Sequence, residues 1–157
     1  MASNYLAIAA DIKTKLTAVS GIGLVHDYER WAAEWSKFIE FFRDPTGKIN
    51  GSEITRVAVP ERFEGVFFRH HHFRVKSYRG VNDAQATGKA FQVMADDVCD
   101  AFRVAEPGTA GVTWRYGDGA NPDNSPAQIV LIDDRMFGSV LCHCSEIALV
   151  VTERIIT

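Results

Sequence analysis

Three consecutive histidines, His70-His71-His72, are the residues of this chain whose types and spacing most directly suggest chemistry. Neutral imidazole is the commonest side-chain metal ligand, so such a run suggests a metal site. The run lies inside VFFRHHHFRVKSY (66–78), whose aromatic and β-branched residues predict a strand. Successive strand side chains point to opposite faces, so His70 and His72 share one face and His71 lies on the other. At most two of the three can therefore bind one ion without further ligands.

A second group of metal-ligand residue types, Cys142-His143-Cys144, occurs in the last predicted strand. Cys142 and Cys144 share one face of that strand and could supply the missing ligands to His70 and His72. However, HxH with CxC spacing is a weaker zinc signature than paired CxxC motifs. Free cysteines are also commonly buried as small apolar residues. A His/Cys metal-binding enzyme or sensor is therefore one alternative function.

Basic and aromatic residues interleave around the histidines, a composition found on surfaces that bind single-stranded nucleic acid. The basic residues are Arg69, Arg74, Lys76 and Arg79. The chain as a whole has 17 Lys and Arg against 20 Asp and Glu, which gives a net charge of −3, and the stretch lacks the glycine-aromatic signature of an RNA module. A small nucleic-acid-binding module is a second alternative, and a solvated or interface strand is favoured over it.

Catalytic motifs are not evident elsewhere in the sequence. Seven residues separate Gly80 from Gly88, whereas a P-loop has four between its glycines, and Ala90 replaces the hydroxyl residue that binds magnesium. Ser139 and Ser145 lack the pattern of a nucleophile elbow. We therefore predict no catalytic residue, no cofactor and no bound metal, which favours an assembly or binding protein over an enzyme.

Length and composition predict one globular domain over residues 1–157, because 46% of the residues are hydrophobic and 24% are charged. Three cysteines without a secretory signal suggest reduced thiols in a cytoplasm. No apolar run approaches the ~20 residues that span a bilayer. We expect a soluble, cytoplasmic chain that binds no membrane.

The order of predicted elements indicates an α+β fold with a mixed, mainly antiparallel sheet and helices packed on one face. Helices are expected over residues 4–18, 28–43 and from a cap at Asn82 or Asp83 to Phe102. Strands are expected over 24–26, 54–59, 66–78, 128–133 and 137–153, with a long loop over 104–126, a hairpin turn over 133–136 and a bend near Ser145-Glu146.

The predicted helix 28–43 has an unusual aromatic content. Trp31, Trp35, Phe38 and Phe42 recur at i, i+4, i+7 and i+11, which places them on one stripe of a helix. Burial of this stripe in the core is the favoured interpretation. A subunit interface is the alternative, because aromatic residues are enriched at interfaces.

The layout of the chain resembles the tail terminator and minor tail proteins of long-tailed bacteriophages, with the related tail-completion proteins. Four stretches carry the likeness: the opening helix that ends in VSGIG before LVH; HFRVKSY (72–78) with the polar segment 79–87; the helix 89–103; and PAQI (126–129) followed by FGSVLCH (137–143) and a long strand to Glu153-Arg154. The likeness covers nearly the whole chain. The aromatic helix 28–43 departs from the leanest members and looks like an insertion.

This resemblance implies an α/β fold whose copies form a ring, typically a hexamer, without catalytic residues or cofactor. The ring would cap the tail tube, end its polymerisation and offer a surface for head attachment. Its partners would be further copies of the chain, the tail tube protein and a head–tail connector protein, in the host cytoplasm during assembly and then in the virion tail. The residues expected on a subunit interface or on the ring lumen are His70, His72, Arg74, Lys76, Trp31 and Trp35. The loop 104–126 would be a docking element that orders on assembly.

Overall fold

The computed structural model describes residues 4–103, 106–108, 111–118 and 125–156. In chain order the elements are α1 (Tyr5–Thr17), β1 (Leu24–His26), α2 (Trp35–Phe42), β2 (Asn50–Ala58), β3 (Glu61–Phe63), β4 (Phe67–Gly80), the 3₁₀ turn η1 (Asp83–Gln85), α3 (Thr87–Arg103), β5 (Trp114–Tyr116), β6 (Ala127–Phe137) and β7 (Val140–Ile155). None of the helices among these residues is long and apolar enough to cross a membrane.

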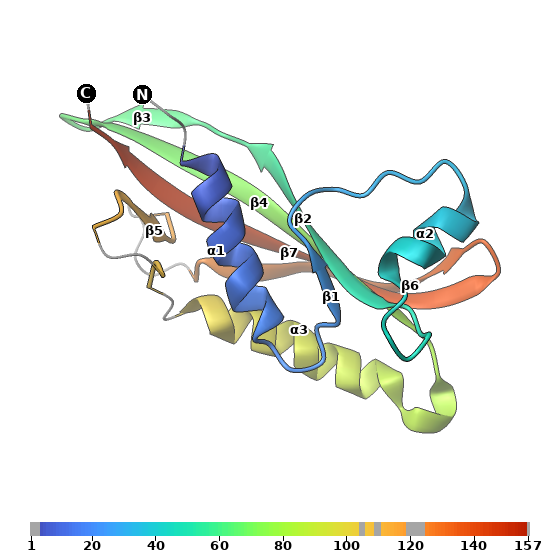
Figure 1. Ribbon diagram of the computed structural model, residues 1–157. Helices are drawn as coiled ribbons and strands as arrows, with labels where there is room; N and C mark the ends of the chain where they lie inside the picture. The colour runs from blue at the N-terminus through green and yellow to red at the C-terminus, as the bar shows by residue number, and fades with distance from the viewer. Residues whose placement is uncertain (1–3, 104–105, 109–110, 119–124, 157) are drawn as a thin grey trace.

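The seven strands form one sheet in the order β1-β2-β4-β7-β5, and the long antiparallel pair of β4 and β7 lies at its centre (Figure 1). β3 pairs with the start of β4, and β6 pairs with the first half of β7. The β1–β2 pair is parallel and the other pairs are antiparallel. The predicted α+β fold with a mixed, mainly antiparallel sheet is therefore confirmed.

The main core lies between the sheet and the helices α1 and α3. We call the face that these two helices cover the helical face, and the other face of the sheet the opposite face. As the alternation predicted, Phe73 and Val75 of β4 are buried on the helical face, and Leu149 of β7 is buried beside them. The two helices contribute a further apolar stripe, which includes Ile8, Ile12, Leu16, Phe91, Met94, Val98 and Phe102.

Two helix boundaries differ from the prediction for local reasons. Asn4 precedes α1, but its side-chain amide donates to Glu153 and Thr113, so it makes no cap hydrogen bond. α3 begins at Thr87, not at a cap on Asn82 or Asp83. Ala86 takes a left-handed backbone conformation, with φ of 50°, and this interrupts the helical path after η1.

The aromatic segment is only partly helical, so the predicted helix 28–43 is wrong over its first turns. The backbone N–H of Arg30 donates to Glu53 Oε2 at 2.8 Å, and the Arg30 guanidinium lies 4.0 Å from the Phe41 ring centroid. These contacts hold the segment against β2 before α2 begins at Trp35. α2 packs on the opposite face, where Phe42 is buried beside the sheet, whereas α1 and α3 share the helical face as expected.

The C-terminal strands also differ from the prediction. Residues 133–136 belong to β6, and the hairpin turn comes at Gly138-Ser139, where Gly138 has φ of 63°. The expected bend near Ser145-Glu146 is absent from β7, which is one strand over 140–155; the irregularity is a bulge at Val130 of β6. The predicted loop 104–126 contains β5, and residues 104–105, 109–110 and 119–124 of it lie outside the described residues.

Packing at the centre of the helical face makes a quantitative prediction. Leu149 is fully buried, so Leu149→Ala should lower the free energy of unfolding by about 2–5 kcal/mol through lost burial and a residual cavity. Val130 is 55% exposed, so Val130→Ala should change it by less than about 0.5 kcal/mol. Urea denaturation measures both. Equal effects of the two substitutions would contradict this placement of the core.

Candidate functional site

The three histidines of β4 alternate between the two faces of the sheet, as predicted. His70 and His72 lie on the opposite face; His70 is buried, and its Nδ1 lies 3.1 Å from Thr152 Oγ1 and 3.5 Å from the Asp118 carboxylate. His72 is half-buried. His71 is fully buried on the helical face. No single ligand can therefore touch all three imidazoles.

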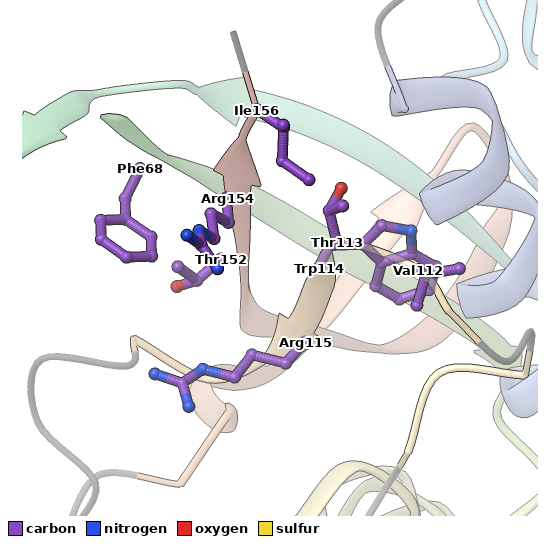
Figure 2. A pocket seen from close by; sticks show the side chains of 8 residues that line it. All are labelled: Phe68, Val112, Thr113, Trp114, Arg115, Thr152, Arg154 and Ile156. Carbon is purple, nitrogen blue, oxygen red and sulfur yellow. The ribbon is translucent and has the colours of Figure 1, made fainter. Parts of the chain in front are cut away.

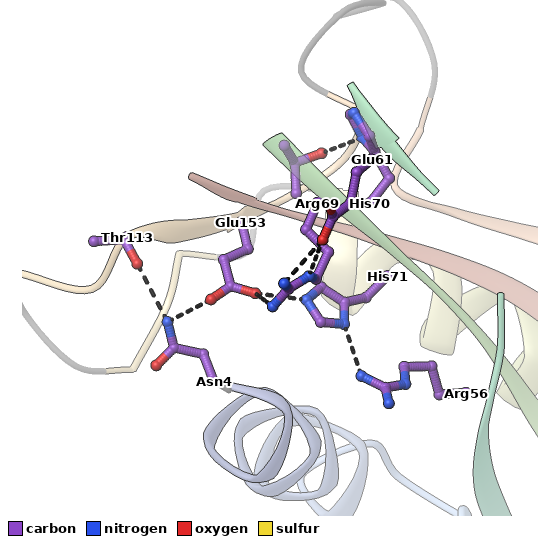
Figure 3. A network of polar contacts seen from close by, with 9 residues as sticks. Asn4, Arg56, Glu61, Arg69, His70, His71, Thr113 and Glu153 are labelled. Carbon is purple, nitrogen blue, oxygen red and sulfur yellow. Dashed lines mark hydrogen bonds and ion pairs between the residues drawn. The ribbon is translucent and has the colours of Figure 1, made fainter. Parts of the chain in front are cut away.

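His71 forms the centre of a buried polar network (Figure 3). Its Nε2 lies 2.8 Å from Glu153 Oε2, and its Nδ1 lies 3.3 Å from a guanidinium nitrogen of Arg56. Guanidinium can only donate, so Nδ1 is the acceptor and Nε2–H donates to the carboxylate. The pKa of His71 is lowered overall: burial is the largest cause, Glu153 acts in the opposite direction, and Arg56 lowers the pKa further. Both effects favour the neutral imidazole that this hydrogen-bond pattern requires.

The Glu153 carboxylate connects this imidazole to other parts of the chain. Asn4 Nδ2 donates to Glu153 Oε1 at 2.8 Å and to Thr113 Oγ1 at 3.3 Å, and Arg69 lies 3.5 Å from Glu153 Oε2. Glu153 thus joins the start of α1, the centre of the sheet and the segment before β5. A buried carboxylate is tolerated only when such partners satisfy it. We interpret the network as a structural junction, because its oxygens are occupied by the protein itself.

The cysteines lie far from the histidines of β4. Cys144 pairs with Tyr78 in the register, and His72 pairs with Val150, six residues further along β7. At roughly 3.3 Å per residue, this separates His72 from Cys144 by about 20 Å. Cys142 and Cys144 are buried in the apolar cluster under α2. In the part of the chain that the structure describes, no three His, Cys, Asp or Glu side chains are placed to hold a metal ion.

A hydroxyl, an imidazole and a carboxylate meet at the start of α3. Thr87 Oγ1 lies 3.0 Å from His143 Nε2, and His143 Nδ1 lies 2.6 Å from Asp134 Oδ1. This order is that of a nucleophilic triad. However, Thr87 Oγ1 also accepts from the Asn82 N–H at 2.8 Å and lies 3.1 Å from the Asn82 carbonyl oxygen. The hydroxyl therefore closes the turn before α3, and His143 attaches that turn to the sheet.

The residues expected on an interface or lumen are placed unevenly. His72, Arg74 and Lys76 form a half-buried basic strip along the opposite face, and the Lys76 ammonium lies 3.5 Å from Glu29. Among the described residues, Arg74 has no ion pair.

Trp31 and Trp35 are 82% and 55% exposed, so the predicted burial of the aromatic stripe in the core is correct for Phe42 but wrong for these two indoles.

Exposed apolar side chains gather at the two ends of the sheet. At one end, Phe63 of β3 and Phe67 of β4 are 66% and 46% exposed, with ring centroids 5.0 Å apart. We call these two residues the β3–β4 patch. At the other end, Trp31 and Trp35 are exposed in the α2 segment on the opposite face, and the register partners Met136 and Leu141 are exposed on the helical face of the β6–β7 hairpin; we call these four residues, which lie on two faces, the α2–hairpin patch. The β3–β4 patch was not predicted, because no strand was expected over residues 61–63.

No protein-family model matches the chain, and no curated protein matches it significantly.

The buried His71 makes stability depend on pH. Its pKa lies below the ordinary value of about 6.5, so the unfolded chain binds this proton more readily than the folded chain. The contribution is complete above pH 6.5 and is lost as the pH falls below it. As the pH is lowered from 7.5 to 5, the free energy of unfolding should therefore fall more steeply for the native chain than for His71→Gln. The difference between the two slopes should reach at most about 1.4 kcal/mol per pH unit. Urea denaturation at several pH values measures this, and parallel slopes would contradict it.

The three thiols should be unreactive in the folded protein. Burial raises the pKa of Cys142 to about 11 and of Cys144 to about 12, and it also raises the pKa of Cys99. Little reactive thiolate is then present at pH 8. We expect Ellman's reagent to modify none of them within minutes in buffer and all of them in denaturant. Rapid reaction of any thiol in the folded protein would contradict this burial.

Proposed function

We propose that this chain is a structural tail protein of a phage or prophage, whose copies associate head to tail into a closed ring that caps the tail tube. The observation that carries the proposal is the pair of dissimilar apolar patches at opposite ends of one sheet. The likeness of the sequence layout to tail terminators supports the same function.

The two patches favour a contact between unlike surfaces. The β3–β4 patch lies at the Phe67 end of the β4–β7 ladder, and the α2–hairpin patch lies near its Gly80 end (Figure 1). These ends are about 40 Å apart at roughly 3.3 Å per residue. Large exposed apolar side chains in clusters mark interaction sites. If the patch at one end binds the patch at the other end of the next copy, the contact is heterologous and generates a ring when the rotation closes.

The conformation of each patch also suits such a contact. Phe63 and Phe67 lie at the end of the sheet, where the three residues of β3 cover one edge of β4 and β7 pairs along its other edge. The Trp35 ring packs edge-on against the Phe137 ring at a centroid distance of 5.9 Å, and this contact holds the indole in place at the surface. In the proposed contact, the aromatic pair of the β3–β4 patch of one copy packs against the aromatic surface of the α2–hairpin patch of the next copy. Aromatic anchors of this kind supply much of the binding energy at interfaces.

In the proposed ring, the basic strip on the opposite face forms part of a surface that is repeated in every copy. His72, Arg74 and Lys76 lie between the two patches along β4, so a head-to-tail ring would repeat them once per copy. We propose that this face is turned toward the lumen or a neighbouring copy. In this account the assembly binds the tail tube protein and a head–tail connector protein, occurs in the host cytoplasm and ends in the virion tail.

The proposal predicts a discrete oligomer. At high protein concentration, light scattering on a size-exclusion column should give one mass of about six chains. Phe63→Ser should shift the mass toward the monomer because it removes an exposed ring from the β3–β4 patch. Val93→Ser is the matched control; Val93 is 59% exposed on α3, away from both patches, so this variant should assemble like the native chain.

A native chain that stays monomeric at every concentration, or a Phe63→Ser variant that assembles as well as Val93→Ser, would contradict the ring contact. A ring that forms but neither binds tail tubes nor stops their elongation would contradict the capping function alone.

A further inference from the structure

A pocket of about 500 Å³ lies where the start of β4, the end of β7 and β5 meet (Figure 2). Its volume is in the range of small-ligand sites, roughly 300–1,000 Å³. The side chains that matter for its chemistry are Phe68, Trp114, Arg115, Thr152, Arg154 and Ile156. Thr113 also lines the pocket and accepts a hydrogen bond from Asn4 of the polar network, whereas the six side chains named above belong neither to that network nor to the basic strip.

Two guanidinium groups line this pocket from adjacent strands. Arg115 of β5 lies opposite Thr152 of β7, and Arg154 follows two residues later on the same face. Such diagonal neighbours are about 7–8 Å apart, a distance that two arginine side chains span easily. Neither arginine makes an ion pair within the described part of the chain, and both are exposed. The two side chains lie on the same face of the sheet, and their guanidinium groups reach different parts of the pocket (Figure 2).

The carboxylates closest in sequence and register are already bound elsewhere. Glu153 points to the helical face, where His71 and Asn4 hold its two oxygens. Asp118 lies 3.5 Å from His70 Nδ1. The hydroxyl of Thr152 donates to the Gly117 carbonyl oxygen at 2.6 Å. The pocket therefore offers positive charge that no described acidic group neutralises.

The remaining wall of the pocket is apolar. Phe68 lies directly opposite Arg154 in the register of β4 and β7. The Trp114 indole packs into the main core on the helical face, so the aromatic side chain beside the arginines on the opposite face is Phe68, with Ile156, 55% exposed, at the rim. A ligand that fills this space would contact both the arginines and a hydrophobic surface.

We propose that this pocket binds a carboxylate attached to an apolar group. The guanidinium fork matches the two oxygens of a carboxylate, and the aromatic wall accommodates the apolar part. A phosphate-rich polymer fits less well, because the net charge of the chain is −3. An acidic side chain beside an aliphatic or aromatic one in a partner protein has this chemistry, and so does a free aryl or alkyl acid. The proposal stands independently of ring formation.

Nuclear magnetic resonance titration tests the proposal with 3-phenylpropionate as the probe and its uncharged amide as the matched control ligand. At about 10 mM, the acid should shift backbone resonances of β5 and of the end of β7, and the amide should not. A short capped Leu-Asp-Leu peptide and its Leu-Asn-Leu counterpart form the second arm. Tighter binding of the acidic peptide than of 3-phenylpropionate assigns the source of the carboxylate to a protein partner, and the reverse assigns it to a free acid.

Charge-removal variants identify the residues responsible. Arg115→Gln and Arg154→Gln should each weaken binding of the acid at least ten-fold. Arg135→Gln is the control, since Arg135 is an exposed arginine at the far end of the sheet, paired with Asp133 at 2.9 Å, and it should bind like the native chain. The proposal would be overturned if 3-phenylpropionate caused no resonance shift, or if its amide or inorganic phosphate bound as well as the acid does. Equal affinity of the acid for all three variants would also overturn it.

Discussion

The antiparallel ladder between β4 and β7 is the constraint on which the rest of this structure depends. Every residue of β4 from Phe67 to Gly80 has a partner on β7. The two-residue period of this pair sends Phe73 and Val75 to the helices and Arg74 and Lys76 to the opposite face. A slip of one residue would exchange the two sets, which would bury charge and expose the core.

The buried network around Glu153 fixes this register at one end of the ladder. In the observed pairing, Glu153 lies opposite Arg69 and diagonal to His71, so a shift of one residue would move its carboxylate to the other face and leave the Asn4 amide without this acceptor. At the other end, the tight turn at Gly138 sets the register of β6 on β7. Polar bonds therefore specify the pairing, and apolar burial stabilises it.

Long periodic elements could be predicted from the sequence, because their alternation or helical spacing is repeated many times. The faces of β4 and the apolar stripe of α3 are examples. The start of α2 could not be predicted, because the contact that holds Arg30 comes from Glu53 on another strand. The polar network could not be predicted for the same reason, because His71 and Glu153 are 82 positions apart in the sequence. Of the three-residue strands, β1 was predicted correctly over 24–26, whereas β3 and β5 were missed because three residues show little alternation.

Of the surface residues expected to mediate assembly, His72, Arg74, Lys76 and the two tryptophans are accessible, whereas His70 is buried against Thr152. The aromatic pair of the β3–β4 patch adds a second surface at the other end of the sheet. The pocket between β4, β5 and β7 could not be predicted either, because its two arginines are 39 positions apart in the sequence and only the sheet brings them together.

The most direct measurement is disulfide cross-linking between two differently labelled populations, one carrying Phe63→Cys and the other Trp35→Cys. The native thiols are buried, so the introduced cysteines are the reactive ones. Head-to-tail association predicts a cross-linked dimer in the mixture, and little in either population alone, because each patch binds the unlike patch of the next copy. Cross-linking within the separate populations, with none added on mixing, would show contacts between like surfaces and would contradict the ring.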